Sequence, residues 1–220
     1  AILLGACAVA GCLAPRADLE QRPTFGLHVA IADDYEVEQT VPETLLGGIP
    51  LDVQGIDGDV DYTSIELSIG ATTYQYVGPA TGADGRPVPE AQAFRRKLAR
   101  LEARIGYADF EDADGTELQA LELAAGGRAF TPINAGVAPY LGALPTVTIF
   151  EDASGISIGA QLGLRLAAGF EIDPTPWLTL DASVDYALPI VEIGPGDVLG
   201  EDADTEFEGA AIRFGVLITL

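Results

Sequence analysis

The stretch "GISIGAQLGLRLAAGFEI", residues 155–172, alternates between apolar side chains and polar or very small ones. Every second residue from Ile156 to Ile172 is apolar, while Arg165 and Glu171 lie on the opposite face with glycine, serine, alanine and glutamine. A period of two residues indicates a β-strand, whose successive side chains point to opposite faces. The stretch is longer than the roughly 9–11 residues that a tilted strand needs to cross a bilayer. One end of such a strand would therefore project beyond a membrane.

The same alternation recurs along the chain and predicts a mainly β protein. A weaker strand is expected over 136–150, where Pro139 and Pro145 each remove a donor from the ladder. The second connection should begin near residue 77 and contain an irregular Pro- and Gly-rich loop over 79–93. That interpretation gives eight strands, whereas an additional hairpin in this connection would give ten. The remaining strands are expected over 25–31, 65–69, 101–107, 121–125, 178–188 and 210–220.

Two architectures produce this alternation. In a soluble sandwich the apolar face is the core, whereas in a membrane barrel it meets lipid. The polar face here is rich in Gly, Ala and Ser, which suits the narrow interior of a small barrel. We therefore predict an all-β, antiparallel up-and-down transmembrane β-barrel of about eight strands.

The charged residues on the polar face nearly balance, as expected for ion pairs in a confined space. Ion pairs on the surface of a soluble sandwich are the alternative interpretation. The residues assigned to the charge network of the barrel interior are Glu66, Arg100, Glu102, Arg104, Glu122, Arg128, Arg165, Glu171, Asp181, Asp185 and Arg213.

The connections between the predicted strands differ in charge. The first, third, fifth and seventh are acidic, whereas the second contains "RRK" at 95–97. Alternate connections of an up-and-down barrel emerge at opposite ends, so we expect long acidic loops at one end and mostly shorter turns at the other. This is the pattern of bacterial outer-membrane barrels, whose long loops face outward. Asp33, Asp112, Asp152 and Asp202 should share one end, and Arg95, Arg96 and Lys97 the other.

The composition limits the classes of partner that this chain can bind. The 220-residue chain has 11 basic and 34 acidic side chains and a formal net charge of -23. No positive field is available to meet phosphates, which argues against nucleic acid as a partner. Neither 57–61 nor 112–115 completes an EF-hand loop. We predict no metal site and no cofactor, and attribute the acidic clusters to solvation or to diffuse attraction of divalent cations.

The first twelve residues have the composition of the end of a secretory signal. They are apolar and too short to span a bilayer as a helix. "VAGC" resembles the lipobox of bacterial lipoproteins, in which the cysteine is lipidated, and "LGAC" fits more loosely. Cys12 and Cys7 are therefore candidate lipid-attachment sites, with an ordinary signal end as the alternative. We divide the chain into a signal remnant at 1–12, a linker at 13–23 and one barrel domain at 24–220.

The stretch "RFGVLITL", residues 213–220, resembles the C-terminal assembly signal of bacterial outer-membrane barrels. Arg213, Gly215, Ile218 and Leu220 take its polar, glycine and two hydrophobic places, although the family usually ends in an aromatic residue. The body of the chain resembles the small eight-stranded barrels of the outer membrane protein A and X type. That resemblance implies the bacterial outer membrane as location, its lipid as a partner, and recognition of the last strand by the barrel-assembly machinery.

Candidates for catalysis are few. His28 is the only histidine, and its phase places it in the interior, with Glu66 expected on the neighbouring strand. In barrel hydrolases that act on lipids, a histidine works with a serine and an acid. A histidine that packs in the interior is the simpler interpretation. The aromatic residues near strand ends, expected to form girdles at the membrane interfaces, are Phe150, Phe170, Trp177 and Tyr186.

These features predict a barrel with a structural or surface-interaction role and no catalytic activity. Eight strands leave an interior that side chains fill, which argues against an open porin. A narrow pore or a barrel that binds a small solute is one alternative. A soluble lipocalin-like carrier, tethered by a lipid, is the other.

Overall fold

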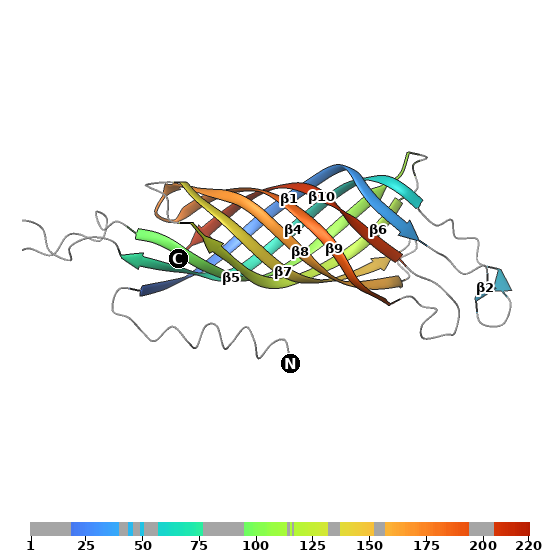
Figure 1. Cartoon of the computed structure of the whole chain (residues 1–220), viewed down its shortest axis with the longest axis horizontal. Coiled ribbons are helices and arrows are strands. Elements are labelled where there is room, and N and C mark those ends of the chain that lie inside the picture. Colours follow the sequence, from blue (N-terminus) through green and yellow to red (C-terminus); the bar gives the residue numbers. More distant parts are fainter. Residues whose placement is uncertain are drawn as a thin grey trace, which may run out of the picture.

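Eight long strands close into a barrel in the computed structural model of this protein (Figure 1). Each strand pairs antiparallel with its neighbours in the sequence, and the first closes against the last. The eight strands are β1 (Leu19–Gln39), β4 (Asp57–Tyr76), β5 (Arg95–Glu111), β6 (Glu117–Phe130), β7 (Val137–Glu151), β8 (Ser157–Thr175), β9 (Leu178–Ile193) and β10 (Thr205–Thr219). The structure describes residues 19–39, 44–45, 49–50, 57–76, 95–113, 115, 117–131, 137–151, 157–193 and 205–220.

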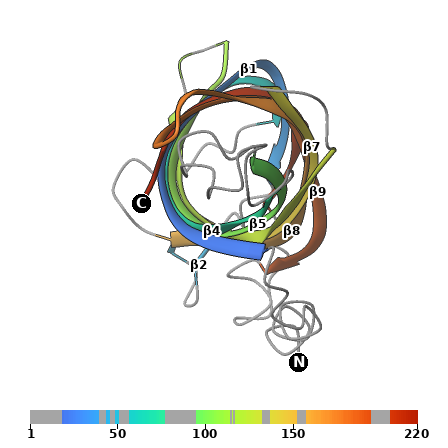
Figure 2. The same cartoon turned by 90° about the vertical axis from the view of Figure 1, so that its left-hand side faces the viewer.

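The barrel closes through the two ends of the chain's β region. Thr24 on β1 lies opposite Thr219 on β10, and the Leu220 N–H donates to the Pro23 carbonyl at 3.1 Å. Figure 2 looks along the barrel axis and shows the strands surrounding the interior. The predicted all-β, eight-stranded, up-and-down barrel is therefore confirmed. The described residues contain no helix that is long and apolar enough to cross a membrane.

The second connection begins where the sequence predicts, but it ends earlier. Strand β4 runs to Tyr76, close to the predicted limit at residue 77, and the expected loop at 79–93 lies outside the described residues. Strand β5 already begins at Arg95, so the "RRK" segment belongs to a strand and not to a turn. A short pair that the sequence pattern did not indicate, β2 (Thr44–Leu45) with β3 (Ile49–Pro50), lies between β1 and β4 along the chain.

Proline interrupts the ladder between β6 and β7, within the segment 136–150 that the sequence predicts to form a weaker strand. Strand β7 spans 137–151, but its pairing with β6 is interrupted between Ala124 and Gly127, opposite Leu144 and Pro145. Proline has no N–H to donate. On the other side of β7, Pro145 stays in register with Leu164 of β8.

We call the two ends of the barrel the loop end and the terminus end. The loop end is formed by the strand ends at Gln39, Glu111 and Glu151 (right in Figure 1), and the terminus end by those at Leu19 and Thr219 (left). Asp33 and Asp112 lie at the loop end, and Arg95 and Arg96 at the terminus end, as predicted from the alternating connections. Asp152 and Asp202 lie outside the described residues.

The strand alternation separates an apolar outer face from a polar interior over the middle of the barrel. Leu67 on β4 is 60% exposed and Ile105 on β5 is 50% exposed, while the alternating Glu66 and Arg104 are buried. Phe170, Trp177 and Tyr186 lie on the outside, where an interfacial girdle requires them. Phe150 does not: its side chain is fully buried inside the barrel. Its assignment to a girdle was wrong, because it has the inward phase of β7.

Candidate functional site

The interior of the barrel is a network of buried charges. All eleven residues assigned to it from the sequence have buried side chains there, and Lys97 joins them. With Lys97 the described interior holds six cationic and six anionic side chains. Because these charges cancel, the net charge of -23 is carried by other residues of the chain. The twelve are Lys97, Arg100, Arg104, Arg128, Arg165, Arg213, Glu66, Glu102, Glu122, Glu171, Asp181 and Asp185.

Glu66 is the centre of one half of this network. Its carboxylate lies 2.6 Å from Arg165, 2.6 Å from Arg213 and 3.2 Å from Arg104. The three arginines come from β8, β10 and β5, so a single side chain of β4 is bonded to strands around the barrel. Gly106 on β5 lies directly opposite Glu66, where a Cβ atom would meet the glutamate side chain at 2.5 Å.

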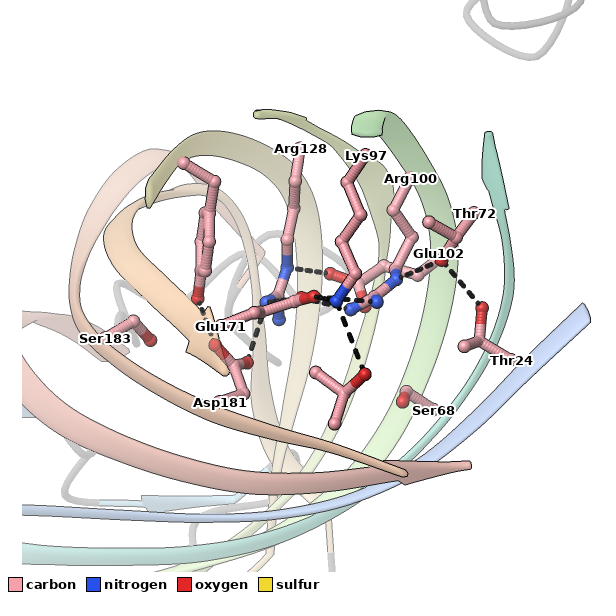
Figure 3. Close-up of polar contacts among 12 residues, drawn as sticks. Thr24, Ser68, Thr72, Lys97, Arg100, Glu102, Arg128, Glu171, Asp181 and Ser183 are labelled. Atoms are coloured by element: carbon pink, nitrogen blue, oxygen red, sulfur yellow. Dashed lines mark hydrogen bonds and ion pairs between the residues drawn. The ribbon is translucent and has the colours of Figure 1, made fainter. Parts of the chain in front are cut away.

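Glu171 is the centre of the other half, nearer the terminus end (Figure 3). It accepts two hydrogen bonds from the Arg100 guanidinium, at 2.5 and 3.0 Å, and one from Lys97 Nζ at 2.7 Å. Lys97 Nζ also donates to Asp173 at 2.6 Å, whose side chain is 36% exposed. Lys97 lies at the terminus end, as predicted, but in strand β5 and not in a turn, and its side chain is buried. It turns inward, because a register irregularity between Thr73 and Tyr74 changes its phase.

Glu102 joins the two halves. Its Oε1 accepts from Arg104 at 2.9 Å and from Arg128 Nε at 2.6 Å. Arg128 in turn donates to Asp181 at 2.7 Å, as the dashed lines of Figure 3 show. The ion pairs thus form one connected chain through the interior, which links six of the eight strands: β4, β5, β6, β8, β9 and β10. Two further pairs, Arg165 with Glu122 at 3.0 Å and Arg213 with Asp185 at 2.6 Å, extend it toward the loop end.

His28 lies in this interior in an arrangement like that of a hydrolytic triad. Its Nε2 lies 3.0 Å from the Ser68 Oγ and its Nδ1 lies 3.7 Å from Asp181 Oδ2. Glu66, the acid expected beside it, is in register with His28 but bonds to arginines. Asp181 is likewise bonded, to Arg128 and to the Tyr140 hydroxyl. The side chains of His28 and Ser68 are both buried within the barrel.

Gly215 makes room for the histidine. It lies opposite His28 on the neighbouring strand β10, and a Cβ atom at this position would overlap the imidazole ring. This explains the glycine that the sequence pattern assigned to the C-terminal assembly signal. Of the other residues of that segment, Arg213 is buried in the charge network, whereas Ile218 and Leu220 are exposed on the outer face.

Five aromatic side chains fill the interior at the loop end, and we call them the aromatic cluster. Tyr35 stacks on Tyr62 with ring centroids 4.6 Å apart, and both hydroxyl-bearing rings are buried. The Tyr62 hydroxyl donates to Glu122 at 3.1 Å, which fastens the cluster to the charge network. Period-two reasoning missed these rings as a group. Members of the aromatic cluster are Tyr35, Tyr62, Phe110, Phe150 and Phe207.

The candidate lipid-attachment sites, Cys7 and Cys12, fall outside the part of the chain that the structure describes. Among the residues described, no group of three or more His, Cys, Asp or Glu side chains is arranged to hold a metal ion.

The fold is that of a small eight-stranded β-barrel. No protein-family model matches the sequence, and no curated protein matches it either. Among solved structures, Neisserial surface protein A has 14% sequence identity, with 89% of this chain and 96% of that chain covered and a TM-score of 0.48. Ail, the attachment invasion locus protein of Yersinia pestis, in complex with the heparin analogue sucrose octasulfate, has 15% identity, coverage of 91% and 99%, and a TM-score of 0.41. At these identities the likeness concerns the fold.

Proposed function

We propose that this protein is an integral barrel of the bacterial outer membrane with a structural or surface-interaction role. The observation that carries the proposal is the inverted polarity of the middle of the barrel. Large apolar side chains are exposed on every strand, while twelve charged side chains are buried inside. Water-soluble proteins rarely expose contiguous apolar patches larger than a few hundred Å². A bilayer is the solvent that suits such a surface.

The filled interior favours a structural role over transport. Ion pairs at 2.5–3.2 Å cross the barrel from several strands, and the aromatic cluster occupies the loop end. A barrel of eight strands has room for little more than its own side chains. We therefore propose no catalytic activity and no open pore.

The interior also argues against the soluble carrier. A lipocalin-like barrel binds an apolar ligand inside and meets water outside, which requires an apolar interior in its middle. Here the middle is ionic and the outer face apolar. The exposed side chains of β10, including Phe214, Ile218 and Leu220, support the proposed recognition of the last strand by the barrel-assembly machinery.

The acidic loop end is proposed to face the exterior. Asp59, Asp61, Glu111 and Glu117 are all exposed there, and the described residues at this end include no basic side chain on the outside. Surface interaction would then take place through an anionic face, with diffuse divalent cations as its counter-ions.

The decisive experiment tests whether the folded full chain requires detergent to stay in solution. We expect a band that shifts when the sample is boiled before electrophoresis, and loss of soluble protein when detergent is diluted away. A folded, monodisperse protein in buffer alone would contradict the membrane assignment. In planar bilayers we expect no steady openings, whereas steady conductance would replace the structural role with the pore alternative.

A further inference from the structure

The polarity of the barrel reverses along single strands. On β4, Glu66 points inward and Leu67 outward, but four to six residues nearer the loop end Tyr62 points inward and Asp61 outward. Both members of each pair belong to one uninterrupted strand. The outer face therefore changes from apolar to acidic where the interior changes from ionic to aromatic.

Strand β5 shows the same reversal at the same level. Arg104 is buried and Ile105 is 50% exposed, whereas toward the loop end Phe110 is fully buried and Asp109 is exposed. Register places Asp61 opposite Glu111 and Tyr62 opposite Phe110, so the two strands change together.

Strand β1 shows the same reversal of polarity, but in this strand it depends on a register shift. Its ladders with β4 and β10 both shift between Ile31 and Glu36. Before the irregularity His28 and Ala30 point inward, and after it Tyr35 and Val37 do, which moves the inward phase from even to odd residues. Without that shift Tyr35 would point outward, and Glu36 inward among the aromatic rings. A bulge that re-aims side chains in this way is a built feature of a sheet.

We infer that the barrel consists of two stacked segments of opposite polarity, and that the loop-end segment is a water-soluble barrel standing clear of the bilayer. Its acidic outside suits water, and its aromatic cluster is the hydrophobic core of an ordinary soluble β structure. This inference rests on the proposed membrane location of the other segment.

Strand length agrees with this division. Strand β1 has 21 residues and β4 has 20, against the roughly 9–11 that cross a bilayer. Part of the surplus lies at the loop end, where the acids begin. The consequence is a rigid extension that holds the acidic connections away from the lipid surface.

Spin labels test where the lipid ends. Single cysteines replace Asp61, Asp109, Leu67 and Ile105 in turn, in a background without the native cysteines, and the labelled proteins are reconstituted into phospholipid vesicles. We expect spin labels at 67 and 105 to be relaxed mainly by oxygen, which concentrates in the bilayer. Labels at 61 and 109 should be relaxed mainly by a water-soluble nickel complex. Oxygen dominance at all four sites overturns this inference but leaves the membrane role intact. Nickel dominance at all four contradicts the proposed membrane location itself.

Hydrogen exchange tests whether the aromatic cluster holds the extension together. Phe110→Ala removes a buried ring, and Phe214→Ala is the control, because Phe214 is 55% exposed on the outer face. We expect amides at 58–62 and 108–111 to exchange roughly a hundredfold faster in Phe110→Ala, with 64–70 little changed. The control should leave both regions protected. Equal exchange at 58–62 in the two variants, or loop-end amides that are already unprotected in the unmodified chain, would overturn the inference.

Discussion

Replacing Arg165 with leucine should be among the most damaging single changes in this barrel. The guanidinium bonds to Glu66 at 2.6 Å and to Glu122 at 3.0 Å, and all three side chains are buried. After the change Glu66 keeps Arg104 and Arg213, whereas Glu122 keeps the Tyr62 hydroxyl as its described hydrogen-bond donor. The damage is therefore concentrated at Glu122, a carboxylate left in a dry interior.

Breaking a buried ion pair from one side costs about 3–5 kcal/mol, because the remaining charge has no compensation. We expect a loss of this size in the free energy of unfolding for Arg165→Leu. The double variant Arg165→Leu/Glu122→Leu removes the orphaned charge as well. Its free energy of unfolding should be about 1–3 kcal/mol higher than the value expected if the two single losses simply added.

Urea unfolding in detergent micelles measures these values, with the gel shift of the unboiled sample as a second probe of the folded barrel. Arg96→Leu is the matched control, because Arg96 is an exposed arginine at the terminus end and its loss should stay within about 0.5 kcal/mol. The reasoning is refuted if Arg165→Leu is as mild as Arg96→Leu. It is equally refuted if the double variant is less stable than the two single losses predict.

Three further predictions concern the outer face, the packing and the sidedness. Leu67→Arg places a charge on the apolar face near mid-barrel and should cost roughly 2–4 kcal/mol in micelles or vesicles; stabilities equal to the unmodified chain would mean that this face meets water. Gly215→Ala should lower the free energy of unfolding by about 1–3 kcal/mol, because the added methyl group overpacks the His28 ring. Adding His28→Ala should recover part of that loss in a denaturant titration, and no recovery would contradict the packing explanation. In a background without the native cysteines, Asp112→Cys should react with an impermeant reagent on intact cells and Arg96→Cys should not, whereas labelling of both, or of Arg96→Cys alone, would reverse the topology.

Period two was sufficient to predict the eight strands of the barrel and the side of each strand that faces inward over the middle of the barrel. Arg165 and Glu171 alternate with leucine, alanine and phenylalanine, and a side chain of a closed strand can point only in or out. The eleven charged residues assigned on that basis are buried in the structure. Which carboxylate meets which guanidinium was not predictable, because Glu66 and Arg165 lie on strands that are distant in sequence. Their meeting depends on the stagger of the whole barrel.

Two of the failures, at Lys97 and in β1, share one physical cause: a phase that changes within a segment. Lys97 was assigned to a turn because of its neighbours in "RRK", but a register irregularity at Thr73–Tyr74 brings it inside. Phe150 was assigned to a girdle because it lies near a strand end. Its inward phase was visible in the sequence, but the assumption that an aromatic residue must face lipid concealed it. The shift between Ile31 and Glu36 leaves no mark in composition, since "ADDYE" reads as an acidic loop.

The pairing of Glu66 with arginines on sequence-distant strands has a consequence for how this chain can fold. The partners of Glu66 on β8 and β10 are separated from it by about a hundred residues or more of chain, as the 99-residue separation from Arg165 shows. A hairpin of β4 and β5 that entered lipid by itself would carry three inward cations against the two carboxylates Glu66 and Glu102. Lys97 and Arg100 would lack their partner Glu171 of β8 and leave positive charge uncompensated in hydrocarbon. The later strands must therefore be in place before the interior is withdrawn from water. Assembly of this barrel should be concerted, with closure of β1 on β10 preceding or accompanying full insertion, and no stable membrane-inserted intermediate made of only the first few strands.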